Sequence, residues 1–177
     1  EREIEKLDDV LVKAIVGQGR VAFVIGDAGR GKTVLMEAFA RQAMEEYSDL
    51  LVASGNCKAY SGIGDPYLPF RDIMAMLAGE VENKWDTGAI TRGHAIRLWE
   101  AFPIVASALV KEAPNSLGIL FQEAVLRDHA ALIEVFSNAA WGSKLKALIQ
   151  HQHTSKKNFE LSHLFQQIAH MLQAIAN

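Results

Sequence analysis

The chain has 177 residues, half of them hydrophobic, and a formal net charge of −3 at pH 7. This length and composition favour a single globular domain and exclude a disordered chain. The small negative net charge excludes a basic field over the whole molecule that would recruit nucleic acid or an anionic membrane. No apolar run approaches the ~20 residues that span a bilayer. Cys57 is the only cysteine, which excludes an internal disulfide, so a reducing, cytoplasmic location is expected.

Residues 1–16 are predicted to form an amphipathic helix. Apolar side chains recur at three- and four-residue spacing, the pattern of one helix face: Ile4, Leu7, Val10 and Leu11. Gly17 and Gly19 follow and are expected to end the helix. The helix either only packs against the rest of the domain, which is the favoured interpretation, or lies beside the site described next.

The motif on which the functional interpretation depends follows this helix. Residues 21–25 form a continuous apolar run, as expected of a buried parallel strand. Residues 26–33 read GDAGRGKT and fit G-x-x-x-x-G-K-[ST], the phosphate-loop or Walker A motif. A helix is expected after them, because apolar residues then recur every four positions. Strand, glycine loop and helix occur in the order that a phosphate loop requires, which argues against a glycine-rich turn that matches by chance.

The motif predicts a nucleotide site built mainly from backbone groups. Glycines in the loop permit the dihedral angles that turn successive N–H groups toward one anion, at the N-terminal end of the next helix. Lys32 is expected to reach the β- and γ-phosphates, and Thr33 is expected to offer its hydroxyl to Mg²⁺. The predicted nucleotide ligands are all the residues of the motif: Gly26, Asp27, Ala28, Gly29, Arg30, Gly31, Lys32 and Thr33.

The rest of the chain is predicted to be one further strand followed by helices. Residues 50–54 form a second apolar run and are expected to be a parallel strand. Residues 55–70 are expected to form a loop, in which Tyr60, Tyr67 and Phe70 either fix the loop to the core, the favoured alternative, or present a surface for a partner or a base. Helical periodicity marks the later segments 69–79, 92–111, 117–138, 141–150 and 158–176. Pro103 is expected to break the second of these helices.

These elements predict an α/β fold, namely a P-loop NTPase core with a partial parallel sheet flanked by helices, and a large all-helical segment in the C-terminal half. We expect one partial domain over residues 1–177. Within it, residues 1–80 form the α/β nucleotide-binding part and residues 81–177 form the helical segment.

No catalytic residue is identified. A P-loop ATPase also needs an acid at the end of a second buried strand, where it orients Mg²⁺. The nearest candidates, residues 125–128 and 132–134, lie in a helical pattern and do not qualify. The chain is therefore expected to bind nucleotide without hydrolysing it. His151 and His153 are interpreted as loop residues rather than metal ligands, because no carboxylate or cysteine completes a set.

Three segments carry a resemblance to a known family. Residues 1–33 resemble the start of the AAA-type ATPase domains of bacterial STAND signal-transduction ATPases, in which the loop often reads Gly-Glu-Ala-Gly-x-Gly-Lys; Asp27 is a mild departure. Residues 55–77 are similar to the family's segment of Gly-x-Cys, a glycine loop and Tyr-x-Pro. Residues 158–177 look like the helix before its acidic Walker B strand, so the chain is expected to stop shortly before the catalytic acid.

The resemblance implies ATP rather than GTP, and a nucleotide-controlled switch in signal transduction or transcription regulation. It also implies a C-terminal helical-repeat or output module in the full-length protein and nucleotide-dependent self-association, with no direct binding of nucleic acid or membrane by this segment. Two alternatives stay open. One is a small-molecule kinase whose helical lid grips phosphates through Arg92, Arg97 and Arg127, and the other is a non-catalytic interaction domain stabilised by its nucleotide.

Overall fold

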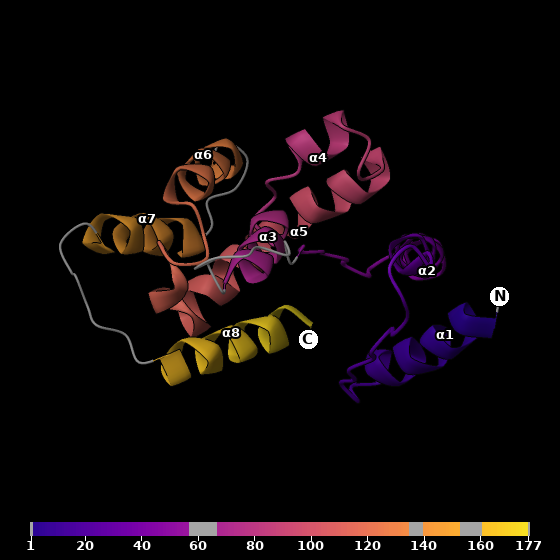
Figure 1. The fold of residues 1–177 in the computed structure, drawn as a ribbon. Helices are drawn as coiled ribbons and strands as arrows, with labels where there is room; N and C mark the ends of the chain where they lie inside the picture. The colour runs from indigo at the N-terminus through magenta and orange to yellow at the C-terminus, as the bar shows by residue number, and fades with distance from the viewer. Residues whose placement is uncertain (1, 57–66, 135–139, 153–160, 177) are drawn as a thin grey trace. The chain divides into compact units, whose positions relative to one another are not determined.

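The structure is a computed structural model that describes residues 2–56, 67–134, 140–152 and 161–176, which are largely helical (Figure 1). The chain divides into two compact units, Glu1–Val52 and Ala53–Asn177. The first unit contains α1 (Arg2–Ile15) and α2 (Lys32–Glu46). The second contains α3 (Leu68–Leu77), α4 (Glu82–Asp86), α5 (Arg92–Glu112), the short 3-10 helix η1 (Pro114–Ser116), α6 (Glu123–Glu134), α7 (Ala140–Gln152) and α8 (Leu161–Ala176).

The first unit consists of α1, α2 and the segments beside them. The prediction that a glycine ends α1 is confirmed, because Gly17 adopts a left-handed φ of 82° two residues after Ile15, the last residue of the helix. The two helices contact each other, and Gln42 Nε2 donates a hydrogen bond to Asp8 Oδ2 over 3.2 Å. Among the residues of this unit that the structure describes, Ala43 is the only buried one. The unit therefore has almost no core of its own.

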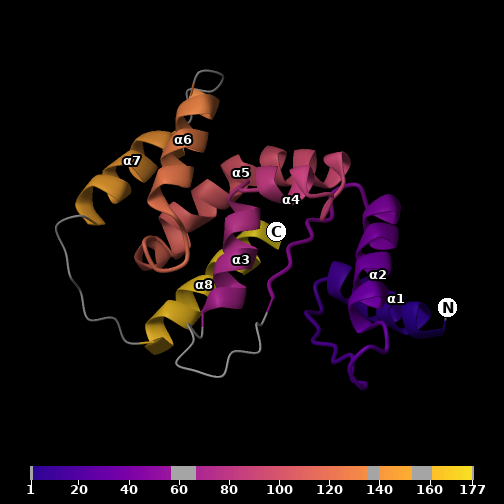
Figure 2. The ribbon, with the colours of Figure 1, turned by 45° about the horizontal axis from the view of Figure 1, so that its top comes forward.

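α5 is the centre of the second unit. It contacts α3, α7 and α8, which surround it in Figure 2. Its buried residues form one broad face of the helix, while Ile96 and Ile104 on the other side are exposed. The buried residues are His94, Ala95, Leu98, Ala101, Phe102, Val105, Ala106, Ala108 and Leu109. They join one hydrophobic core with apolar side chains of the neighbouring helices, including Met74, Leu126, Leu145 and Met171.

The helices that periodicity predicts in this unit are confirmed, and two details differ. Pro103 does not break its helix, since α5 continues through it. Buried contacts on both sides of Pro103 hold the helix together although proline lacks the N–H donor. α6 begins at Glu123 rather than near residue 117, because residues 118–120 form a turn in which Gly118 has a φ of 73°.

The predicted α/β fold is wrong: no residue that the structure describes lies in a strand or a sheet. Residues 21–25 and 50–54, the two predicted strands, have no regular secondary structure. A strand exists only where a neighbouring strand accepts and donates its backbone hydrogen bonds, and neither run has such a neighbour among the described residues. Val21, Phe23 and Ile25 are instead 81%, 83% and 92% exposed, so an apolar run alone does not produce the partial parallel sheet.

Candidate phosphate-binding site

The predicted phosphate loop, residues 26–33, leads directly into α2. Gly29 and Gly31 adopt left-handed φ angles of 76° and 77°, a region that residues with a side chain seldom occupy. α2 starts at Lys32, and its N-cap residue Gly31 offers no side-chain acceptor to the first turn. The N–H of Leu35 donates to the Gly31 carbonyl over 2.9 Å. The N–H groups before it have no acceptor within the helix, which is the arrangement that binds anions at helix N-termini.

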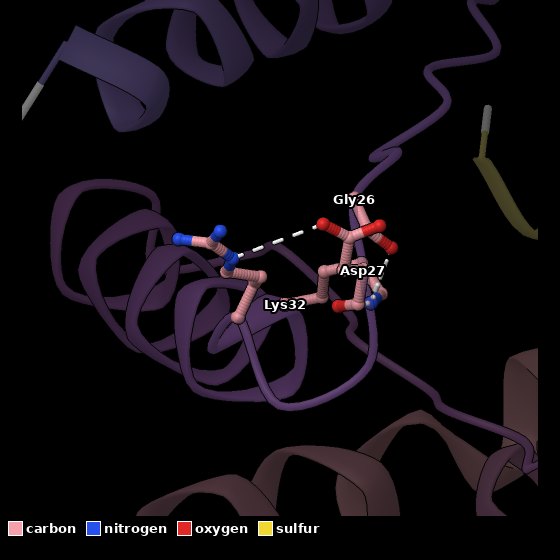
Figure 3. A network of polar contacts seen from close by, with 4 residues as sticks. Gly26, Asp27 and Lys32 are labelled. Carbon is pink, nitrogen blue, oxygen red and sulfur yellow. Dashed lines mark hydrogen bonds and ion pairs between the residues drawn. The ribbon is translucent and has the colours of Figure 1, made fainter.

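The Lys32 side chain folds back over the loop. Its Nζ donates to the carbonyl of Gly26 over 2.8 Å and to the carbonyl of Asp27 over 2.7 Å, as Figure 3 shows. An ammonium group attracts the negative end of each carbonyl dipole, and these two acceptors lie at the start of the loop. These two hydrogen bonds hold the Lys32 ammonium group beside the loop backbone, with which it is predicted to bind phosphate.

The side chains at the other loop positions are open to solvent. Arg30 Nε lies 3.9 Å from Asp27 Oδ2, and the two side chains are 76% and 89% exposed. Ala28 is exposed, and so is Thr33, the second residue of α2. The structure therefore brings all the predicted ligands together in one continuous loop at the start of a helix.

The residues present fit a nucleotide phosphate chain with its magnesium ion. Positive groups come from Lys32, Arg30 and the N-terminal end of α2, while the glycines leave room for a close approach of the anion. Mg²⁺ bound with a nucleotide takes phosphate oxygens and waters besides a few protein ligands. Thr33, exposed at the second position of α2, is the residue of the loop that would offer it a hydroxyl. No cluster of three or more His, Cys, Asp or Glu side chains that could hold a metal by themselves occurs in the described part of the chain.

The contacts of Lys32 with the two carbonyls, and the approach of Arg30 to Asp27, were not predicted from the sequence. The contact between Arg30 and Asp27 could have been predicted, because the two residues carry opposite charges and lie three positions apart. The first contact has no local signal, because any glycine-rich loop offers carbonyls to a lysine.

Other candidate residues fall elsewhere. Residues 125–128 and 132–134 lie in α6, which confirms that neither segment ends a strand. Tyr67 and Phe70 lie beside Phe165 of α8, with ring centroids 6.2 and 6.4 Å apart. Tyr67 packs against the hydrophobic core, as the favoured interpretation expects, whereas Phe70 belongs to α3 and is 40% exposed. Among the remaining candidates, Arg92 and Arg97 belong to α5 and Arg127 to α6, whereas Cys57, Tyr60 and His153 lie outside the described residues.

The motif of residues 26–33 is that of a P-loop nucleotide-binding protein. A more particular assignment comes from the family comparison: residues 1–85 match the model of the AAA ATPase domain. The N-terminal part of the chain is thus an AAA-type P-loop ATPase domain, and it is nucleotide-binding and ATPase-like in character. Neither the curated proteins nor the solved structures include a match to this chain.

The family match confirms the AAA part of the resemblance seen in the sequence. It ends at residue 85 and therefore covers α1, α2 and α3 but not α5 to α8. No helix within the described ranges is both long and apolar enough to cross a bilayer.

Proposed function

We propose that the chain binds ATP together with Mg²⁺ through residues 26–33. The observation that carries this proposal is the position of Lys32, whose Nζ is held by the Gly26 and Asp27 carbonyls at the start of α2. A lysine at this place lies next to both the loop backbone and the helix N-terminus, the two elements that bind phosphate in P-loop proteins. The family match over the same residues supports the proposal.

Each part of the loop has its own role in this proposal. Backbone N–H groups of residues 26–33 that have no partner within the loop bind the phosphates, and the left-handed φ angles of Gly29 and Gly31 support such an arrangement. Lys32 exchanges its carbonyl acceptors for β- and γ-phosphate oxygens. Thr33 provides its hydroxyl to the ion, which when bound neutralises part of the charge of the phosphates.

The biological role that we propose is that of a STAND-like regulatory ATPase in the cytoplasm. In the full-length protein, which we propose to be an ATPase, ATP binding closes the domain and hydrolysis resets it, which controls an output module or self-association. In this proposal residues 1–177 belong to one ATPase domain, with the nucleotide-binding part in residues 1–80. The full-length protein should therefore change its oligomeric state between ATP, ADP and no nucleotide. An equal state in all three conditions would argue against the switch.

The binding proposal is tested by calorimetric titration of the chain with ATP, ADP and GTP, each with and without Mg²⁺. We expect ATP binding that Mg²⁺ strengthens. Lys32→Ala should reduce ATP affinity by about tenfold or more, because a hydrogen bond to a charged group contributes roughly 1.5–3 kcal/mol. Thr33→Ala should reduce mainly the Mg²⁺-dependent part of the affinity, and Thr33→Ser should restore it.

Lys6→Ala is the matched control, since Lys6 is an exposed lysine of α1 outside the loop. It should leave ATP affinity unchanged. Equal affinities of the wild type and Lys32→Ala, with both proteins folded by circular dichroism, would reject the phosphate-loop assignment. Production of ADP that depends on an added acceptor would instead favour the kinase alternative.

A further inference from the structure

Asp27 lies close to both cationic side chains of the phosphate loop, Lys32 and Arg30. Its backbone carbonyl accepts from Lys32 Nζ over 2.7 Å and from the N–H of Arg30 over 3.4 Å. Its carboxylate oxygen Oδ2 lies 3.9 Å from Arg30 Nε. Figure 3 shows the Lys32 side chain beside Gly26 and Asp27. Both cationic side chains of this loop therefore lie near an oxygen of Asp27, Lys32 near its carbonyl and Arg30 near its carboxylate.

The contact between Asp27 and Arg30 is weak, so the Arg30 guanidinium can leave the carboxylate for a phosphate group at a small cost in free energy. Both side chains are mostly exposed, and water and salt screen an ion pair of this kind so strongly that it contributes little. A phosphate group carries more negative charge than a carboxylate, and a guanidinium binds it with two parallel N–H donors. Arg30 therefore gains from leaving Asp27 when a phosphate chain enters the loop.

Arg30 lies in a turn whose backbone can stay in place while its side chain moves from Asp27 to a phosphate group. The hydrogen bond from the Arg30 N–H to the Asp27 carbonyl closes residues 27–30 into a turn, and Arg30 directly precedes Gly31, the N-cap of α2. Its side chain thus starts one position before the helix end at which phosphate is expected. Rotation of side-chain bonds, without any change of the backbone, is enough to move the guanidinium.

We propose that Arg30 is a second phosphate-binding cation of this site and that the Asp27 carboxylate competes with the nucleotide for it. The inference rests on the proposed function, because it names the groups that set the affinity of the same loop. Asp27 then lowers nucleotide affinity in two separable ways, by holding Arg30 and by repelling the phosphates directly.

A double-mutant cycle separates these effects. ATP·Mg²⁺ and ADP·Mg²⁺ are titrated by calorimetry at low ionic strength into the wild type, Asp27→Asn, Arg30→Gln and the double variant. Arg30→Gln should lower ATP affinity by about three- to tenfold. Asp27→Asn should raise it by about threefold in the wild-type background and by clearly less in the Arg30→Gln background. High salt should reduce all of these differences.

Arg41→Gln is the control, because Arg41 is an exposed arginine of α2 outside the loop; it should leave ATP affinity unchanged. An Arg30→Gln variant that binds ATP as the wild type does would overturn the inference while leaving the phosphate loop intact. The inference also fails if Asp27→Asn raises affinity equally in both backgrounds, since Asp27 then acts by repulsion alone. A wild-type chain that binds no ATP would reject the proposed function itself.

Discussion

His129 links three parts of the second unit. Its side chain is buried, and Nδ1 lies 2.7 Å from the carbonyl of Ala78, directly after α3. Because a carbonyl only accepts, Nδ1 carries the hydrogen of this bond. The imidazole lies between two rings of α5, with centroid distances of 4.7 Å to Trp99 and 5.5 Å to Phe102. His129 thus connects α6 to the end of α3 by a hydrogen bond and to α5 by ring contacts, and its Nε2 also lies 3.9 Å from Glu82 Oε1.

Gly79 makes this contact possible. It has a φ of 83°, and a Cβ atom at this position would lie 3.1 Å from His129 Nδ1. We predict that Gly79→Ala destabilises the chain by about 2–4 kcal/mol, through the cost of a left-handed alanine and through displacement of the imidazole. Urea denaturation followed by tryptophan fluorescence measures this change.

Gly88→Ala separates the two causes. Gly88 also has a positive φ, 71°, but nothing lies within 4 Å of the added Cβ. This variant should lose only about 1–2 kcal/mol, the cost of the left-handed backbone. Equal losses in both variants would show that the imidazole is not held as tightly as the structure indicates.

At the scale of single residues, the Walker A motif predicts more of the candidate site than the periodicity of apolar residues does. The spacing of residues 26–33 predicted a glycine loop that leads into a helix, and the structure has this order, with Lys32 and Thr33 as the first residues of α2. The strand expected before the loop is absent from the described residues. The importance of His129 was not visible, because its partners Ala78 and Trp99 are far away in the sequence. Contacts between distant residues leave no local pattern.

At the scale of elements, helices and strands differ in how far a local sequence determines them. A helix makes its hydrogen bonds within itself, and α3, α5, α7 and α8 lie close to the segments that periodicity marks. A strand depends on a partner elsewhere in the chain. Residues 21–25 have the composition of a buried strand and remain exposed without one. The error in the predicted fold class has this single physical origin.

The start of α5 offers a test of local stabilisation. The N-cap residue Thr91 accepts a hydrogen bond from the N–H of His94 over 3.2 Å through its hydroxyl oxygen. Thr91→Ala should lower the free energy of unfolding by about 1 kcal/mol, because one N–H of the first turn then loses its acceptor. Thr91→Ser retains the hydroxyl and should unfold close to the wild type. Thermal unfolding followed by circular dichroism measures both variants. Equal losses of stability in Thr91→Ala and Thr91→Ser would contradict the role of the hydroxyl.

At the scale of the whole molecule, stability is unevenly distributed. The second unit contains the hydrophobic core, in which Leu98 and Phe102 of α5 are almost fully buried. The first unit has one buried residue among those described, Ala43, and leaves large apolar side chains such as Phe23 and Val34 exposed. The predicted nucleotide ligands therefore lie in the unit with the smaller buried area.

This difference predicts the pattern of amide hydrogen exchange. Opening a segment costs free energy in proportion to the apolar contacts that it breaks. We expect the amides of α1 and α2 to exchange faster than the central amides of α5, after correction for the intrinsic rate of each peptide. Mass spectrometry of peptic fragments measures both sets in the same sample.

The same measurement connects stability with binding. If ATP·Mg²⁺ binds the loop, the ligand stabilises whatever conformation it binds, so exchange should slow at residues 26–36 more than in α5. Lys32→Ala should abolish this added protection while leaving the difference between the two units in place. Equal protection of α2 and α5 in the absence of nucleotide would contradict the uneven stability. The first unit would then be as stable as the unit that contains the core, for a reason other than the burial of its side chains.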